Sequence, residues 1–98
     1  MERMRVAVSG ACGRMGQEVC RTILEEESMK LVGAFDLQDP GGDLGVILGR
    51  QPLDIKIEEL TPKNLERCRP AVLVDFTTPM VVMQNIETAL QCGVRPVV

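Results

Sequence analysis

The chain has 98 residues, of which 45% are hydrophobic and 26% charged, and its formal net charge is −3. This length fits one domain, and the composition is that of a globular protein rather than a disordered one. Only Phe35 and Phe76 are aromatic. A net negative charge with so few stacking side chains argues against a nucleic-acid partner.

The cysteine and histidine content argues against a metal-binding protein and against a disulfide-bonded one. The chain has four widely spaced cysteines and no histidine, so the sequence predicts no metal site. We expect reduced cysteines, as in a cytoplasmic protein. No apolar stretch reaches the roughly 20 residues that span a bilayer, and no signal peptide precedes the first predicted strand. The sequence therefore predicts a cytoplasmic protein without a membrane partner.

The first half of the chain alternates short apolar runs with amphipathic segments. Residues 5–9 are predicted to form a strand, and residues 14–26 carry apolar side chains at helical spacing. A second strand is predicted over 30–35, and the glycine-rich segment 37–49 is predicted to be a loop with room for one helical turn. Alternating residues over 53–57 predict a half-exposed edge strand.

The second half carries two helix-start signals, each a threonine followed by proline. Thr61 is predicted to cap a short helix that ends near Cys68, and Thr78 a longer helix that stops at Gly93. Between them lies an apolar strand over 71–75. The face of the second helix that we expect to be apolar consists of Val82, Ile86, Ala89 and Leu90.

A last strand is predicted over 94–98. Apolar strands that alternate with amphipathic helices indicate a parallel sheet covered on both faces. We therefore expect a single α/β domain of the doubly wound type, with three layers.

A glycine-rich turn separates the first strand from the first helix. It consists of Gly10, Ala11, Cys12, Gly13, Arg14, Met15 and Gly16. At the carboxyl end of a parallel strand, glycines let backbone N–H groups approach a pyrophosphate, which the helix N-terminus stabilises. We expect Gly10 to make the tight turn and Gly13 to allow the close approach of a pyrophosphate. Gly16 is expected to let the helix pack closely on the strand. Taken alone, such glycines are as often simple turn residues.

Asp36 closes the second strand, twenty residues after Gly16. Dinucleotide sites of the Rossmann type place a carboxylate there on the ribose hydroxyls. No basic residue follows, since the next are Leu37 and Gln38. A 2′-phosphate would therefore meet a negative charge, and NADH is the preferred cofactor. Arg14 can pair with a phosphate, which keeps NADPH possible; a solvated turn aspartate is the alternative.

Phe76 and Thr77 follow a central strand, and we expect them to line the cofactor groove near the nicotinamide. Asp75 is expected to hold loop amides rather than to act chemically. An ordinary strand-to-helix loop is the alternative. No nucleophile–base pair is visible, so the sequence predicts no catalytic residue.

The motif Gly-Arg-Met-Gly at 13–16 occurs together with Asp-Phe-Thr at 75–77. Three further segments, at 6–10, 31–34 and 42–45, are typical of the same family of enzymes. In these features the chain resembles, over nearly its whole length, the dihydrodipicolinate reductases (4-hydroxy-tetrahydrodipicolinate reductases) of lysine biosynthesis. The resemblance implies pyrophosphate binding by Gly10 to Met15, ribose binding by Asp36, and nicotinamide contacts from Phe76 and Thr77.

It also implies hydride transfer to 4-hydroxy-tetrahydrodipicolinate, giving tetrahydrodipicolinate in the diaminopimelate route. That family carries a Gly-Thr-Thr-Gly segment and, in a substrate domain, a His-His pair and a lysine, and this chain has none of these motifs. We therefore expect residues 1–98 to be the amino-terminal cofactor domain, truncated before the substrate domain and inactive alone. The full-length parent would bind the small-molecule substrate and is expected to be a homo-oligomer.

Two other functions stay open at this point. One is a stand-alone module that binds or senses a nucleotide. The other is the cofactor domain of an amino-acid or homoserine dehydrogenase, which would share the glycine turn but is not expected to carry Asp-Phe-Thr.

Overall fold

The computed structural model describes residues 2–98. Five parallel strands form one sheet in the order β3-β2-β1-β4-β5. The strands are β1 (Met4–Ser9), β2 (Met29–Phe35), β3 (Ile57–Glu58), β4 (Val72–Asp75) and β5 (Arg95–Val97). The helices are α1 (Arg14–Glu25), α2 (Leu44–Ile47), α3 (Pro62–Cys68) and α4 (Pro79–Gln91).

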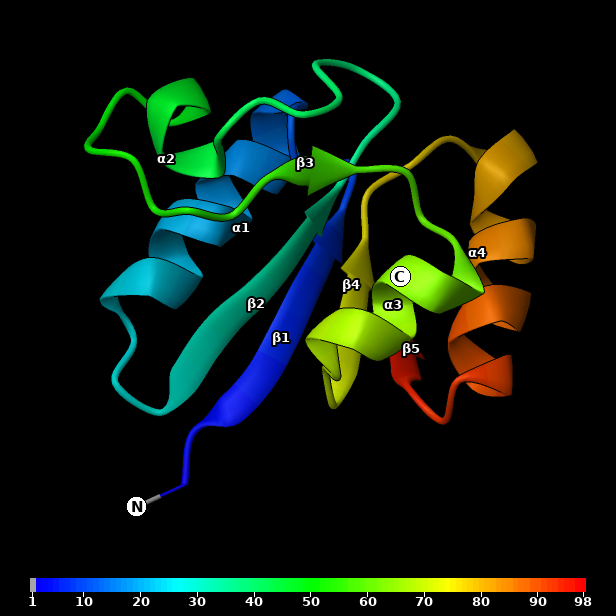
Figure 1. The fold of residues 1–98 in the computed structure, drawn as a ribbon. Helices are drawn as coiled ribbons and strands as arrows, with labels where there is room; N and C mark the ends of the chain where they lie inside the picture. The colour runs from blue at the N-terminus through cyan, green and yellow to red at the C-terminus, as the bar shows by residue number, and fades with distance from the viewer. Residues whose placement is uncertain (1) are drawn as a thin grey trace.

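The helices cover both faces of the sheet, with α1 and α2 on one side and α3 and α4 on the other (Figure 1). Alternate side chains of β1 serve the two layers: Val6 and Val8 pack with Cys20 of α1, whereas Ala7 packs with Leu65 of α3. Because strands that are covered on both faces must be apolar throughout, this packing explains the unbroken apolar runs in the sequence. The predicted three-layer, doubly wound α/β fold is confirmed.

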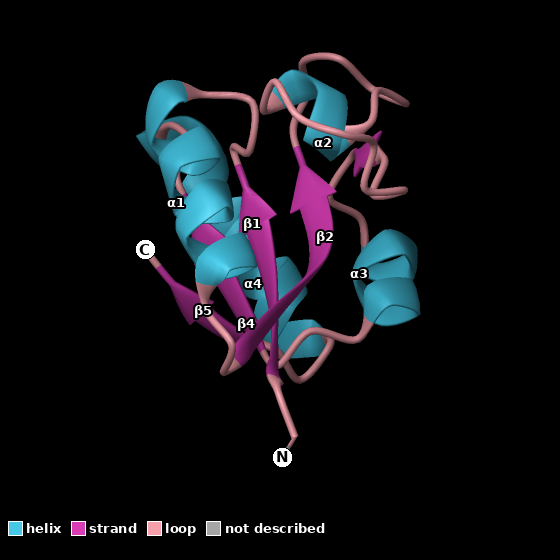
Figure 2. Ribbon diagram, turned by 90° about the vertical axis from the view of Figure 1, so that its left-hand side faces the viewer, coloured by secondary structure: helices cyan, strands magenta, loops and turns pink. Residues whose placement is uncertain are grey.

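The strand order sets the position of a ligand crevice. From β1 the chain proceeds outward to β2 and β3, and then returns to place β4 on the other side of β1. Figure 2 shows β2, β1 and β4 side by side, with the arrowheads of β1 and β2 at the same end of the sheet. Ser9 and Asp75, the last residues of β1 and β4, are register partners. Open parallel sheets bind ligands at such a switch point.

The edge strand predicted over 53–57 is wrong in extent, since β3 contains only Ile57 and Glu58. The carboxylate of Asp43 explains the difference. It accepts the backbone N–H of Leu53 at 3.0 Å and that of Asp54 at 2.8 Å, which ties this segment to the start of α2 rather than to β2. The helical turn expected in the preceding loop is present as α2.

The buried face of α4 also differs from the prediction. Ala89 is buried as expected, but Leu90 is 63% exposed and Asn85 is buried. The expected cap at Thr61 is present, because its hydroxyl accepts the N–H of Asn64 at 3.1 Å. Thr78 is the N-cap residue of α4 and Pro79 its first residue, as predicted, but the Thr78 side chain makes no capping hydrogen bond.

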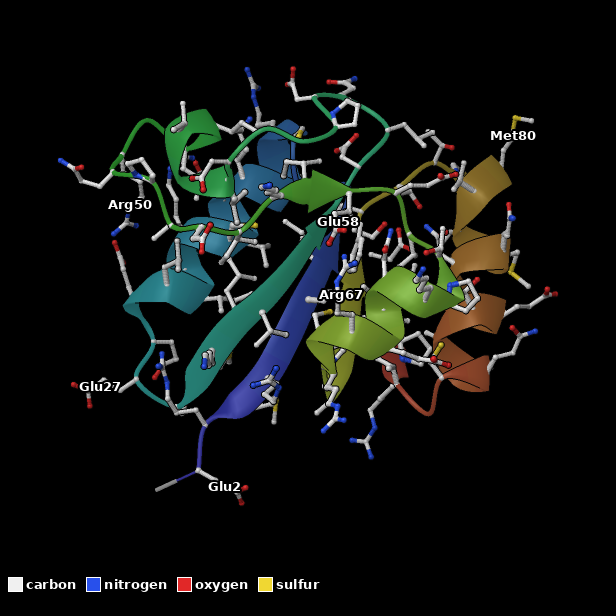
Figure 3. All side chains as sticks on the ribbon, in the orientation of Figure 1. Glu2, Glu27, Arg50, Glu58, Arg67 and Met80 are labelled. Carbon is white, nitrogen blue, oxygen red and sulfur yellow. The ribbon has the colours of Figure 1, made fainter. Side chains whose placement is uncertain are left out.

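Charged side chains radiate outward from the ribbon (Figure 3). Glu58 of β3 and Arg67 of α3 point toward one another and form an ion pair, while Met80 projects into solvent from the first turn of α4. Within residues 2–98, the helices are all too short or too polar to cross a membrane.

Candidate functional site

The glycine turn lies at the carboxyl end of β1 and has a tightly constrained backbone. Gly10 has a φ of +80°, a conformation that favours glycine. A Cβ on Gly10 would also lie 3.0 Å from the carbonyl carbon of Phe76. A Cβ on Gly16 would lie 2.0 Å from the carbonyl oxygen of Gly10. The structure therefore confirms the tight turn at Gly10 and the close packing at Gly16, where helix α1 meets the turn.

Gly13 differs from these two glycines. Its φ is −76°, and a Cβ there would meet only the carbonyl oxygen of Gly10, at 3.5 Å. Neither backbone strain nor internal packing requires glycine at this exposed position. The lack of a side chain leaves open space in front of the N-terminus of α1.

Most amides of the turn are already bonded within the chain. The N–H groups of Gly10 and Ala11 both donate to the carbonyl oxygen of Phe35, at 2.8 and 3.2 Å. The N–H of Gly13 donates to Gly10 at 3.2 Å, and that of Cys12 to the carboxylate of Asp36 at 2.9 Å. These hydrogen bonds stabilise the turn, so the four N–H groups are not free to bind a ligand.

The free donors come one step later. The backbone N–H groups of Arg14 and Met15, in the first turn of α1, have no acceptor among residues 2–98. The first amides of a helix lack intrahelical partners and attract anions. Both side chains are exposed, Met15 by 59%. The sequence predicted that the whole turn binds a phosphate. In the structure, the N–H groups without an acceptor within the described residues lie at the start of α1.

Asp36 stands directly after β2 and faces the glycine turn. Its Oδ2 accepts the N–H of Cys12 and its Oδ1 accepts the N–H of Gln38, each at 2.9 Å. A carboxylate has about four acceptor positions, so two remain for other donors on this half-buried side chain. The prediction of a carboxylate in register with the turn is matched by a direct hydrogen bond between them.

Cys12 belongs to the glycine turn, and its side chain lies beside the loop that follows Asp36. Its Sγ is 3.6 Å from the carbonyl oxygen of Gln38. Burial raises the pKa of the Cys12 thiol to about 11, and the charges of Asp36 and Asp39 add to that effect. The side chain is therefore a neutral thiol at physiological pH, and it brings no negative charge to the phosphate side of the turn.

A buried polar cluster lies on the other side of the turn, below the loop that follows β4. Asp75 accepts the backbone N–H of Thr77 at 2.7 Å and also its hydroxyl, as expected of a residue that holds loop amides. The side-chain amide of Asn85 donates to the other oxygen of Asp75 at 2.9 Å and lies 3.3 Å from the Ser9 hydroxyl. The sequence interpretation missed Asn85; the available signal was a polar residue between apolar positions of α4.

Phe76 joins this cluster to the glycine turn. Its backbone N–H donates to the carbonyl oxygen of Ser9 at 2.9 Å, and its own carbonyl group lies against Gly10. Its side chain is 39% exposed. The carboxyl ends of β1, β2 and β4 thus bring the turn, Asp36, Phe76 and Thr77 to one end of the sheet. The residues that the sequence predicts for a cofactor site therefore lie together at the switch point of the sheet.

Comparison with known proteins gives a consistent picture. Residues 4–98 match the family described as "Dihydrodipicolinate reductase, N-terminus". The 4-hydroxy-tetrahydrodipicolinate reductase of Desulfitobacterium hafniense (strain DSM 10664 / DCB-2) is 48% identical over an alignment of 98 residues, which covers 99% of this chain and 37% of that protein. The chain thus spans little more than a third of the length of this curated relative.

Solved structures agree with the fold. A dipicolinate-bound dihydrodipicolinate reductase from Paenisporosarcina sp. TG-14 superposes with a TM-score of 0.73 at 35% identity, over 96% of this chain and 36% of that one. Aspartate semialdehyde dehydrogenase with NADP from Candida albicans gives a TM-score of 0.79 at 14% identity, over 97% and 29% of the two chains, and so shares the Rossmann-like fold. The chain belongs to the dihydrodipicolinate reductase N-terminal family, whose fold is a cofactor-binding domain of the Rossmann type.

Proposed function

We propose that this chain binds a nicotinamide dinucleotide, NADH in preference to NADPH, across the switch point between β1 and β4. The observation that carries the proposal is the bonded pair of glycine turn and Asp36, with free amides at the start of α1. The pyrophosphate would lie on the N–H groups of Arg14 and Met15, in the space that Gly13 leaves open.

The preference for NADH rests on charge. Asp36 keeps two acceptor positions for ribose hydroxyls, whereas a 2′-phosphate would meet its negative charge. Leu37 and Gln38 carry no positive charge that could compensate the negative charge of the phosphate. The basic residue of the glycine turn is Arg14, which is exposed. Arg14 would reduce the preference for NADH over NADPH without reversing it. On the nicotinamide side, the groove would be lined by Phe76 and Thr77.

We further propose that the domain serves a reductase that reduces 4-hydroxy-tetrahydrodipicolinate to tetrahydrodipicolinate in lysine biosynthesis. The bound cofactor supplies the hydride, and residues of this chain bind and orient it. Membership of the family favours this reaction over that of an amino-acid or homoserine dehydrogenase. Substrate binding and proton donation would belong to a further domain, so we expect residues 1–98 alone to be inactive.

Isothermal titration calorimetry of the 98-residue chain tests the binding proposal. Titrations with NADH, NADPH and ADP-ribose should show binding of all three, with NADH tighter than NADPH. The absence of binding by both NADH and ADP-ribose at millimolar concentration would overturn it. Tighter binding of NADPH would leave the dinucleotide site standing and refute the role given to Asp36.

A further inference from the structure

The polar cluster at the switch point is buried to an unusual degree for such groups. Ser9 is 2% exposed, Asp75 4% and Asn85 6%. Neither of the two salt bridges found within residues 2–98 includes Asp75. Buried polar groups need hydrogen-bond partners, and here neutral donors alone satisfy the carboxylate. Thr77 is the half-buried member, so a ligand at the switch point would reach the cluster through Thr77.

The direction of each hydrogen bond follows from the chemistry of the groups. The hydroxyl of Thr77 donates its proton to Oδ1 of Asp75, which also accepts the backbone N–H of Thr77. The amide nitrogen of Asn85 lies 3.3 Å from the Thr77 oxygen and can only donate to it. The two amide protons of Asn85 are shared among Asp75, Ser9 and Thr77, so the Thr77 hydroxyl has used its single proton and at most one of its two lone pairs. What it can still offer a ligand is an acceptor.

We propose that Asp75 and Asn85 fix the polarity of the Thr77 hydroxyl, so that the site selects a hydrogen-bond donor on the nicotinamide riboside half of the cofactor. That donor is an N–H of the carboxamide or an O–H of the ribose. The inference rests on the proposed function and deepens it. Thr77 is the residue that touches the ligand, while Asp75 and Asn85 are positioning residues that act through it.

The geometry favours this role over a purely structural one. Ser9 and Asp75 are the paired last residues of the two strands that flank the switch point. The loop that carries Thr77 begins with Phe76, whose backbone lies against Gly10 of the phosphate turn. The cluster therefore connects α4 to both halves of the predicted cofactor groove. A structural cluster would change the thermal stability of the chain but not the relative affinity for ligands with and without nicotinamide.

The first test compares Thr77→Val with its neighbour Thr78→Val as the matched control, since the Thr78 side chain makes no capping bond. Loss of one hydrogen bond should weaken NADH binding about 3- to 10-fold in Thr77→Val and change ADP-ribose binding by less than about twofold. Thr77→Ser should restore NADH affinity, and Thr78→Val should behave as the parent chain. An unchanged ratio of NADH to ADP-ribose affinity in Thr77→Val would refute the inference.

The second test asks whether Asn85 acts through Thr77. Asn85→Leu replaces the amide with a bulkier apolar group of the same branched shape, and Gln84→Leu, on the exposed side of the same helix, is the control. Asn85→Leu should lower the ratio of NADH to ADP-ribose affinity, and the double variant with Thr77→Val should lose no more than Thr77→Val alone. Additive losses would contradict a positioning role.

A third test uses a cofactor analogue and does not depend on whether the Asn85→Leu variant folds. Reduced 3-acetylpyridine adenine dinucleotide carries an acetyl group in place of the carboxamide and so lacks its N–H donor. If Thr77→Val weakens NADH but not this analogue, the carboxamide is the donor; if it weakens both, the ribose hydroxyl is. If it weakens neither, the inference fails while NADH binding still supports the proposed function. Failure of the parent chain to bind NADH and ADP-ribose would instead overturn the proposed function, and this inference with it.

Discussion

The backbone N–H of Cys12 donates to Oδ2 of Asp36 at 2.9 Å and so joins the glycine turn after β1 to the end of β2. One carboxylate thereby has two tasks, since it holds the turn in shape and also presents acceptor positions at the place expected for a ribose. Because the donor is a main-chain group, the link does not depend on the identity of the side chain at position 12.

The first prediction concerns Asp36. In Asp36→Ala, NADH affinity should fall about 10- to 100-fold, as expected when hydrogen bonds to a charged group are lost. NADPH affinity should fall less, since the repulsion of the 2′-phosphate is lost as well. Calorimetric titration of both cofactors measures the difference. Asp39→Asn is the control, because this exposed residue has a left-handed φ of 51° that asparagine tolerates. Equal losses for the two cofactors would refute the role of Asp36 in selectivity.

Two glycine variants should separate folding from binding. Gly16→Ala places a methyl group 2.0 Å from the carbonyl oxygen of Gly10, and overpacking of this kind should cost about 1–3 kcal/mol or more of unfolding free energy. In Gly13→Ala the methyl group has room within the chain, so stability should fall by less than about 1 kcal/mol. NADH affinity should nevertheless fall about tenfold or more, equivalent to about 1.4 kcal/mol. Thermal unfolding and titration of both variants check this, and undiminished NADH binding by Gly13→Ala would contradict the predicted phosphate position.

Asp43 should make the stability of the chain dependent on pH in the acid range. The N–H of Leu53, together with those of Val46, Gly45 and Asp54, lowers the pKa of its carboxyl group in the folded state. A lowered folded-state pKa stabilises the fold above the ordinary pKa of 3.8 and ceases to do so as the pH falls through the lowered value. Asp43→Asn should therefore melt at a lower temperature than the parent chain at neutral pH.

The difference in melting temperature should stay constant down to about pH 4 and shrink below it. Calorimetric melting curves between neutral pH and pH 3 provide the measurement. Asp54→Asn is the matched control, because the Asp54 side chain makes no hydrogen bond within residues 2–98 and asparagine tolerates its φ of 59°. A gap that widens on acidification would contradict the assignment.

Cys12 should react slowly with alkylating agents near neutral pH. Its pKa is raised to about 11 by burial and by the charges of Asp36 and Asp39, and the thiolate is the reactive form. Iodoacetamide labelling followed by mass spectrometry should give a rate at Cys12 that is still rising at pH 9. Asp36→Asn removes one of the charges and should increase that rate at a given pH. A plateau of the parent rate below pH 9 would show that the thiol is not shielded in this way.

Much of the fold was predictable, because apolar periodicity reflects burial on each element. The helix expected over 14–26 is Arg14–Glu25, and the strand expected over 30–35 is Met29–Phe35. The failures come from side chains that bond across the sequence. The segment 53–57 has the alternation of a strand, yet Asp43, ten residues before Leu53, binds its amides and shortens β3.

The candidate site was predictable in outline for a similar reason. Turn glycines and a carboxylate at the end of a strand leave a clear pattern, and the fold brings Asp36 to the turn as expected. Which amides remain free is not visible in the sequence, because it depends on bonds such as those from Gly10 and Ala11 to Phe35. Asn85 was overlooked because one buried amide on a largely apolar helix face resembles a tolerated exception until its partners are known.

The glycine turn is held from two sides, by Asp36 through Cys12 and by the backbone of Phe76 against Gly10. In the proposed site, the residues expected at the adenosine end and at the nicotinamide end follow different strands, and the main chain of the turn connects them. Such a division is modular. On the proposed assignment, changes at the end of β2 should alter the selectivity for a 2′-phosphate without altering the residues expected to orient the nicotinamide. Changes after β4 should likewise leave the adenosine end intact.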